Sequence, residues 1–179
     1  MTSPSKIHIA YNVNEHERIV NPVLNSKPDL LYYFYHEGQN KDINIDQYRN
    51  NIDFLTQQCP NMEIIQDSVD YVDYYDIIAK LASIISKQRE SEIVINMGTG
   101  SKMVALANLD AYRLWDIDII YPYSLNYDPT NEFAHTGNLM SAELPKFEFR
   151  TPTPHLIRLL QLIYWLMHHD RYNRDKDHI

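Results

Sequence analysis

The feature that most constrains the fold of this chain is a strand, a glycine turn and a helix that follow one another between residues 92 and 115. Residues 93–95 form a short apolar run, as expected of a strand that is buried on both faces of a parallel sheet. Residues 96–101 place two of the chain's four glycines one residue apart, and a helical pattern begins at Lys102. This order of elements directs unpaired backbone N–H groups and the positive end of a helix dipole at one point, which attracts phosphate.

The residue types in the turn suit such a site. Gly98 and Gly100 let the backbone approach a ligand closely, while Thr99 and Ser101 add hydroxyl donors. Lys102 adds a full positive charge on a flexible stem. Any α/β unit needs a turn here, however, so the glycine spacing also fits a turn without a ligand. The spacing matches neither the Walker loop nor the G-x-G-x-x-G dinucleotide fingerprint.

Apolar runs and helical patterns alternate through the first 121 residues. Strands are expected at residues 6–10, 30–35, 62–66, 93–95 and 117–121. Helices are expected at residues 15–25, 45–59, 70–85 and 103–115, with Asp70 as the N-cap of the third. This alternation predicts an α/β, Rossmann-like fold, a mainly parallel sheet with helices on both faces. Ligands of such sheets bind at the carboxyl ends of the strands, where the loops at residues 11–15, 36–44 and 96–101 would meet.

The pattern changes after residue 121. Residues 122–140 are polar and lack periodicity, so a long loop or insertion is expected there, and residues 141–149 alternate well enough for a final edge strand. Residues 155–168 are apolar over a wide helical face, which indicates packing against a partner subunit or a further domain. We therefore expect a Rossmann-like domain over residues 1–150. Residues 151–179 would form a linker and a C-terminal helix, serving dimerisation or beginning an effector domain absent from this chain.

Composition narrows the class of protein. The single cysteine, Cys59, excludes an internal disulfide framework and a cysteine zinc site. No apolar run approaches the roughly 18 residues of a membrane span, and the polar start is no signal peptide, so a cytoplasmic protein with no membrane partner is expected. A net charge of −8 and an isoelectric point near 5.4 make duplex DNA an unlikely partner. Local donors can still bind a small anion against this global charge.

Polar residues also follow the first two strands. Asn12, His16 and Arg18 come after the first strand, where they fit a ligand-binding loop or, equally, a solvated turn with a helix cap. His36 ends the second strand beside Glu37, a pairing that is more often part of a loop than an acid–base pair. If the sheet is parallel, these residues share its carboxyl edge with the glycine turn.

A metal site is not expected. His168, His169 and Asp170 are adjacent near the end of a helix, where neighbouring side chains point apart, and no third ligand has suitable spacing. The chain has no Ser-His-Asp order and no H-E-x-x-H pattern. We therefore expect no metal and no cofactor.

Four segments of the sequence carry a resemblance to a known family. They are Ile7-His-Ile-Ala-Tyr-Asn12, Glu17-Arg-Ile-Val-Asn-Pro22, Tyr35-His-Glu37 and Ile95-Asn-Met-Gly-Thr-Gly-Ser-Lys102. Together they resemble CARF domains, the CRISPR-associated Rossmann-fold sensors, over roughly residues 6–150. The central motif of that family varies around a Gly/Ser-Thr-Gly/Ser-Lys core, which residues 98–102 match. The most similar members are archaeal proteins in which a CARF domain precedes a winged-helix regulator domain.

The resemblance implies a homodimer that binds cyclic oligoadenylate across its two-fold axis and acts as a sensor in a type III CRISPR antiviral response. The expected ring is cyclic tetra-adenylate. The ligand-binding residues would then be Tyr11, Asn12, His16, Arg18, His36, Asn96, Gly98, Thr99, Gly100, Ser101 and Lys102.

The resemblance leaves a second activity open, a metal-independent ring nuclease. In that reaction a ribose 2′-OH attacks the adjacent phosphate in line and leaves a linear product with a 2′,3′-cyclic phosphate, which mainly requires positioning and charge stabilisation. Lys102 would stabilise the developing charge, and Asn12 or His16 would orient the 2′-OH. A third possibility, an ordinary nucleotide-binding Rossmann enzyme, is disfavoured because the G-x-G-x-x-G fingerprint is absent. Sensing and cleavage are not separated by the sequence.

Overall fold

The computed structural model describes residues 6–36, 44–127, 130, 135–142, 144–145 and 152–174. The chain divides into two compact units, Met1–Phe147 and Glu148–Ile179. Within the described ranges, no helix is both long and apolar enough to cross a membrane.

The first unit contains a six-stranded sheet with the strand order β3-β2-β1-β4-β5-β6. Strands β1 to β5 run parallel, and β6 pairs antiparallel with β5. The predicted α/β, Rossmann-like fold with a mainly parallel sheet is confirmed. The strands are β1 (Lys6–Tyr11), β2 (Leu30–His36), β3 (Glu63–Val69), β4 (Glu92–Asn96), β5 (Asp118–Tyr127) and β6 (His135–Ala142).

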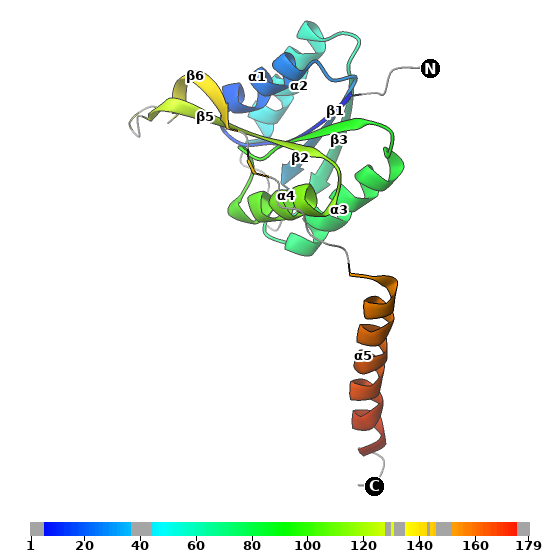
Figure 1. Ribbon diagram of the computed structural model, residues 1–179. Coiled ribbons are helices and arrows are strands. Elements are labelled where there is room, and N and C mark those ends of the chain that lie inside the picture. Colours follow the sequence, from blue (N-terminus) through cyan, green and yellow to red (C-terminus); the bar gives the residue numbers. More distant parts are fainter. Residues whose placement is uncertain are drawn as a thin grey trace. The chain divides into compact units, whose positions relative to one another are not determined.

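Helices cover both faces of this sheet, as Figure 1 shows. They are α1 (His16–Ser26), α2 (Ile45–Gln58), α3 (Tyr74–Lys87) and α4 (Lys102–Leu114). One face packs against α3 and α4 through a buried cluster that includes Ile7, Ile9, Ile77, Leu81, Ile93, Ile95, Val104 and Ala107. The other face packs against α1 and α2 through Ala10, Ile19, Val20, Val23, Leu31, Tyr33, Tyr48 and Leu55. Successive residues of a strand point to opposite faces, so the continuous apolar runs are buried on both sides.

Residues 122–140 are more regular than the sequence predicted. β5 continues to Tyr127 and pairs with β6, so a hairpin replaces much of the expected long loop. The edge strand lies at His135–Ala142 rather than at residues 141–149, of which 143 and 146–149 lie outside the described residues. Pro122 does not end β5, because β4 pairs with β5 only over residues 118–120 and no bond to β4 requires the missing N–H.

The start of α3 also differs from the prediction. Its N-cap is Asp73, whose Oδ1 accepts hydrogen bonds from the backbone N–H groups of Tyr75 (2.8 Å) and Asp76 (3.2 Å). Asp70 lies one turn earlier, and its carboxylate accepts the N–H of Val72 at 3.0 Å. Residues 70–73 therefore form a loop between β3 and α3, not the first turn of the helix.

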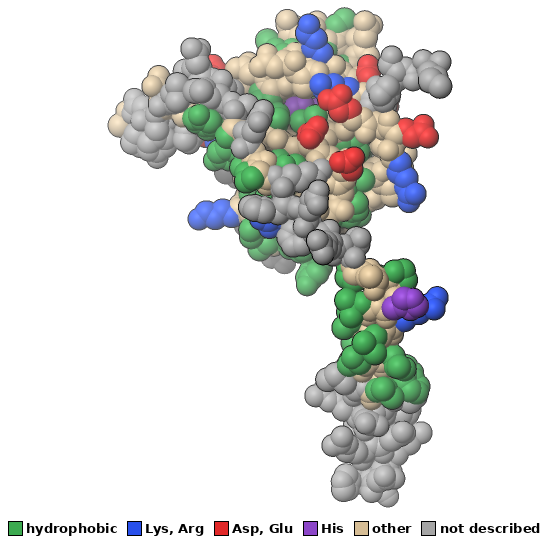
Figure 2. All heavy atoms as spheres, in the orientation of Figure 1, with side chains coloured by type: hydrophobic (Ala, Val, Ile, Leu, Met, Phe, Trp, Pro, Cys, Tyr) green, Lys and Arg blue, Asp and Glu red, His purple; other side chains and the backbone are tan. Residues whose placement is uncertain are grey.

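The second unit contains α5 (Pro154–Arg174), which confirms the predicted C-terminal helix. Its apolar side chains are between 43% and 67% exposed. Figure 2 shows them along the helix. They are Leu156, Ile157, Leu159, Leu160, Leu162, Ile163, Tyr164, Trp165 and Leu166.

Candidate functional site

The carboxyl ends of β1 and β4 mark the candidate site. These two strands are neighbours at the centre of the sheet, and the chain continues outward from them in opposite directions, to β2 and β3 on one side and to β5 and β6 on the other. In open α/β sheets, ligands bind in the crevice at such a switch point. The glycine turn follows β4, and the loop that contains Asn12 follows β1, so the sequence prediction places both at this crevice.

Asn96 holds the first half of the turn between β4 and α4. Its side chain is fully buried; Nδ2 donates to the carbonyl oxygen of Arg18 at 2.8 Å, and Oδ1 accepts the N–H of Gly98 at 3.0 Å. The next N–H, that of Met97, donates to the carbonyl oxygen of Ile120 at 2.8 Å. The turn is therefore fixed to both α1 and β5.

The two glycines of the turn are required by the protein itself. A Cβ at Gly98 would lie 2.6 Å from Cδ and 2.8 Å from the carbonyl oxygen of Pro122 in β5, closer than carbon and oxygen atoms pack. Gly100 has φ +93°, in the left-handed region, and a Cβ there would also lie 2.8 Å from the Val104 side chain. Packing and backbone conformation explain both residues, whether or not a ligand also approaches them.

The hydroxyl groups of the turn are engaged inside the protein. Thr99 is buried, and its Oγ1 donates to the carbonyl oxygen of Asn96 at 3.4 Å while accepting the N–H of Tyr11 at 3.3 Å. Ser101 is the N-cap of α4; its Oγ accepts the N–H of Val104 at 3.1 Å and donates to the carbonyl oxygen of Tyr71. Each hydroxyl has only one proton, so in this arrangement neither is left to donate to a ligand.

The donors that remain open are main-chain groups and one amine. The backbone N–H groups of residues 100–103 form no hydrogen bond with any described residue. Lys102 is exposed and has no ion-pair partner within the described part of the chain. These groups lie at the positive end of the α4 dipole, so together they provide an environment that favours an anion.

Asn12 and His16 belong to a buried chain of hydrogen bonds. The Tyr33 hydroxyl donates to Asn12 Oδ1 at 2.9 Å and accepts from Asn51 Nδ2 at 2.7 Å, and His16 Nδ1 lies 2.5 Å from Asn51 Oδ1. Asn12 Nδ2 donates to the carbonyl oxygen of Asn44 at 3.1 Å. Both polar atoms of the Asn12 side chain therefore form hydrogen bonds within the protein. This series of hydrogen bonds connects the ends of β1 and β2 to α1 and α2.

Arg18 lies beside the turn and has a spare donor. Its backbone carbonyl accepts the hydrogen bond from Asn96, and its Nη1 is 2.7 Å from Glu15 Oε2. Its Nε is buried and has no hydrogen-bond partner among the described residues. Leaving a buried donor unpaired costs about 1–3 kcal/mol, which an anion or a water molecule at this position would offset.

The side chains of Tyr11 and His36 form hydrogen bonds within the protein. The Tyr11 side chain is buried, and its hydroxyl donates to Asn108 Oδ1 at 2.8 Å. Burial raises the pKa of Tyr11 above its usual value, and the hydrogen bond to Asn108 opposes this shift only in part, so the phenol stays neutral. His36 Nδ1 accepts the N–H of Tyr71 at 3.1 Å. Among the predicted site residues, Lys102 and Arg18 each have a side-chain donor that no described residue engages.

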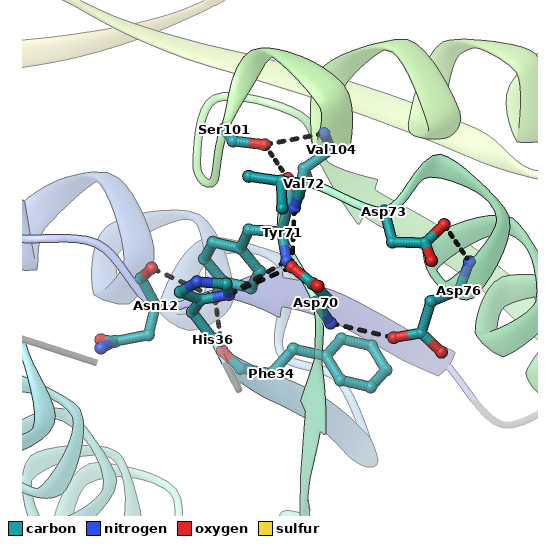
Figure 3. Close-up of polar contacts among 10 residues, drawn as sticks. All are labelled: Asn12, Phe34, His36, Asp70, Tyr71, Val72, Asp73, Asp76, Ser101 and Val104. Atoms are coloured by element: carbon teal, nitrogen blue, oxygen red, sulfur yellow. Dashed lines mark hydrogen bonds and ion pairs between the residues drawn. The ribbon is translucent and has the colours of Figure 1, made fainter. Parts of the chain in front are cut away.

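The loop after β3 was not predicted to belong to the site. Figure 3 shows Tyr71 between Asn12, Phe34, His36 and Ser101, with a hydrogen bond to each. Both Asp70 and Asp73 are followed by an aspartate three residues later, so either fits the start of a helix. With Asp70 as the predicted N-cap, Tyr71 was expected in the first turn of α3 and not in a loop at the edge of the sheet.

The site shows no arrangement for a metal. Among the described residues, no group of three or more His, Cys, Asp or Glu side chains could hold an ion. His168, His169 and Asp170 lie in α5, where the structure does not describe their side chains.

A central switch point, a fixed glycine turn and open donors at a helix N-terminus form a candidate ligand site on a Rossmann-like domain. The family described as "HFX_2341_N:-like, N-terminal" matches residues 6–126, and the chain belongs to this family. No curated protein matches the sequence.

Three solved structures are similar in fold. Can2 from Sulfobacillus thermosulfidooxidans, in complex with cyclic tetra-adenylate, is 22% identical with a TM-score of 0.56, over 65% of this chain and 31% of Can2. Csm6 from Enterococcus italicus, bound to cyclic hexa-2′-fluoro-hexa-dAMP, is 15% identical with a TM-score of 0.55, over 68% of this chain and 34% of Csm6. A type III CRISPR defence DNA nuclease activated by cyclic oligoadenylate is 14% identical with a TM-score of 0.55, over 68% of this chain and 19% of the nuclease. The matched region spans about a third or less of each of these proteins.

Proposed function

We propose that this protein is a CARF-type sensor of the type III CRISPR response and binds cyclic oligoadenylate, with cyclic tetra-adenylate as the expected ring. The observation that carries the proposal is the row of backbone donors at residues 100–103, next to the amine of Lys102, none of which is engaged by a described residue. These donors lie at the switch point of a fold shared with Can2, which was solved with that ring, and with Csm6, which was solved with a related one.

The charges near the turn support a small anion rather than a large one. The chain as a whole carries a net charge of −8, which opposes the approach of duplex DNA. Lys102 is exposed, and Arg18 is paired with Glu15 through Nη1 but keeps a buried Nε donor that no described residue engages. A phosphate that reaches the turn would meet main-chain donors, the positive end of a helix dipole and the Lys102 amine.

We further propose that the active form is a homodimer with the ring on its two-fold axis. One chain provides one such turn, whereas a cyclic oligoadenylate carries several phosphates related by symmetry, which a two-fold pair of turns would match. The outer face of α4 has Leu106 at 54% and Leu114 at 61% exposure, and α5 adds further exposed apolar side chains. Association of two chains would remove such surfaces from water.

Cleavage of the bound ring is the second candidate. Its support is the amine of Lys102, which pairs with no described carboxylate and is available to stabilise charge on a phosphate in the transition state. Asn12 is a weaker candidate than the sequence suggested for orienting the 2′-OH, because Tyr33 and Asn44 occupy both of its polar atoms.

One experiment tests the proposed function and separates the two candidates. Labelled cyclic tetra-adenylate is titrated with the protein at about 150 mM salt in EDTA, and the products are then resolved. We expect saturable binding of the ring and negligible binding of linear tetra-adenylate or random duplex DNA. An intact ring supports sensing, whereas a linear product with a 2′,3′-cyclic phosphate supports cleavage. Duplex DNA bound as tightly as the ring, or no binding of the ring, would refute the proposal.

The homodimer gives a separate prediction. Sedimentation equilibrium at micromolar concentration should give twice the chain mass of 21.2 kDa. Leu106→Glu should shift the population toward monomer, because it places a charge on the exposed apolar face of α4. Gln57→Glu adds the same charge at an exposed position of α2, on the other face of the sheet, and should leave the dimer unchanged. A monomeric wild-type protein, with and without ring, would contradict this prediction.

A further inference from the structure

We infer that Tyr71 is a positioning residue for the β4–α4 turn. The loop at residues 70–73 would then belong to the ligand-binding edge of the sheet, together with the ends of β1 and β2 and the turn after β4. The inference rests on the proposed function where it concerns the ligand. Tyr71 itself is only 8% exposed, so it acts through the groups that it holds and not by contact with a ligand.

The phenol of Tyr71 anchors the loop beneath two strand ends. Its hydroxyl lies 2.9 Å from the carbonyl oxygen of Phe34, at the end of β2, and 3.2 Å from that of Asn12, just after β1. The single hydroxyl proton is shared between these two acceptors. The ring also packs edge-on against Tyr11, with 5.9 Å between ring centroids.

The main chain of Tyr71 connects the same anchor to two more segments. Its N–H donates to His36 Nδ1 at 3.1 Å, and the two rings lie against each other with centroids 5.1 Å apart. Its carbonyl oxygen accepts the hydroxyl proton of Ser101. All the polar groups of this one residue are therefore engaged, and together they join the ends of β1 and β2 to the turn after β4 (Figure 3).

The contact with Ser101 orients the start of α4. The Ser101 hydroxyl donates its proton to the Tyr71 carbonyl, and a lone pair of the same oxygen accepts the N–H of Val104 at 3.1 Å, so one oxygen atom joins the loop to the start of the helix. This bond caps the helix whose first N–H groups are the open donors. The direction of those donors relative to β1 and β2 is thus set by Tyr71, a residue 30 positions earlier in the chain.

The test compares Tyr71→Phe with Tyr48→Phe. Tyr48 is a matched control, since it is also buried and its hydroxyl also donates to a β2 carbonyl, that of Tyr33 at 3.1 Å, but from α2 on the opposite face. We expect the hydrogen-bonded amides of Gly98 and Val104 in this turn to exchange hydrogen faster in Tyr71→Phe but not in Tyr48→Phe. Affinity for cyclic tetra-adenylate should likewise fall only in Tyr71→Phe, by about fivefold, the scale of one neutral hydrogen bond. Ser101→Ala should reproduce both effects, and Ser101→Thr, which keeps the hydroxyl, should restore both.

Several outcomes would overturn the inference. Exchange at Gly98 and Val104 that is as slow in Tyr71→Phe and Ser101→Ala as in the wild type would show that Tyr71 does not hold the turn. A loosened turn with unchanged affinity would show that its position does not matter to the ligand. If the wild type binds no ring while exchange at the turn responds as expected, the proposed function fails and the structural role of Tyr71 stands. Ser101→Ala keeps the test decisive if Tyr71→Phe does not fold.

Discussion

Lys102→Ala is expected to weaken binding of cyclic tetra-adenylate by about 1.5–3 kcal/mol, roughly 10- to 150-fold, while leaving the fold intact. The lost interaction is a charge-assisted contact to phosphate. If the protein also cleaves the ring, the rate at saturating ligand should fall further, because charge grows on the phosphate in the transition state. Titration with labelled ring and single-turnover cleavage measure the two effects.

The stability of the same variant provides the second half of this test. Lys102 is the first residue of α4, where a positive charge opposes the helix dipole, and no described carboxylate pairs with it. Its removal should raise the free energy of unfolding by some tenths of a kcal/mol. Lys87→Ala, at the last residue of α3, removes an equal charge from the favourable end of a helix; it should slightly lower stability and leave affinity unchanged. Unchanged affinity in Lys102→Ala, or loss of its fold, would mean that the turn has another role.

The largest effect on stability is expected at acidic pH and arises from His8 in β1. This side chain is 1% exposed, and Nδ1 lies 2.9 Å from the hydroxyl oxygen of Ser26. Ser26 gives its own proton to the carbonyl of Val23, so Nδ1 is the protonated nitrogen, and Nε2 is buried without a hydrogen-bond partner among the described residues. Burial, assisted by the charge of Lys6, lowers the pKa of His8 from 6.5 to about 3.

The sign of the pH effect follows from these two pKa values. Below pH 6.5 the unfolded chain binds a proton at His8 that the folded protein does not bind until about pH 3, so acidification favours unfolding. Above pH 6.5, His8 does not lower the free energy of unfolding. Below pH 6.5 this free energy falls by up to about 1.4 kcal/mol per pH unit, or by about 2–3 kcal/mol at pH 4.5.

Urea unfolding at pH 7 and at about pH 4.5 measures this loss. His8→Gln should remove most of it, because glutamine does not titrate in this range. His155→Gln, at an exposed position in α5, is the control and should lose as much stability on acidification as the wild type. Equal acid sensitivity in the wild type and His8→Gln would show that His8 is protonated in the folded state.

Local patterns were sufficient to predict most of the fold. The strands and helices up to residue 121 are each encoded by their own apolar spacing, and a parallel sheet follows from their alternation. The hairpin of β5 and β6 was missed because residues 122–140 are mostly polar and begin with Pro122. Only the three-dimensional structure shows that Pro122 lies beyond the part of β5 that pairs with β4. The N-cap of α3 was misplaced because Asp70 and Asp73 carry the same local signal.

The site was predicted less completely, for a related reason. The turn at residues 96–101 and its place at the sheet edge follow from residue type and element order. The partners of its side chains do not, since Thr99 binds a residue 88 positions away and Ser101 one 30 positions away. Sequence spacing cannot show whether a hydroxyl faces a ligand or a distant carbonyl. This is why Thr99, Ser101 and Asn12 were expected to face the ligand but are engaged within the protein.

The contact between Gly98 and Pro122 affects how motifs of this kind should be interpreted. If β5 leaves no space for a side chain at residue 98, a descendant that no longer binds any ligand would still need glycine there to fold. The left-handed backbone at residue 100 imposes the same requirement. The presence of these two glycines therefore indicates that a chain has this fold, not that it binds a ligand. Lys102 pairs with no described carboxylate, so it is the position whose loss would accompany the loss of the proposed function.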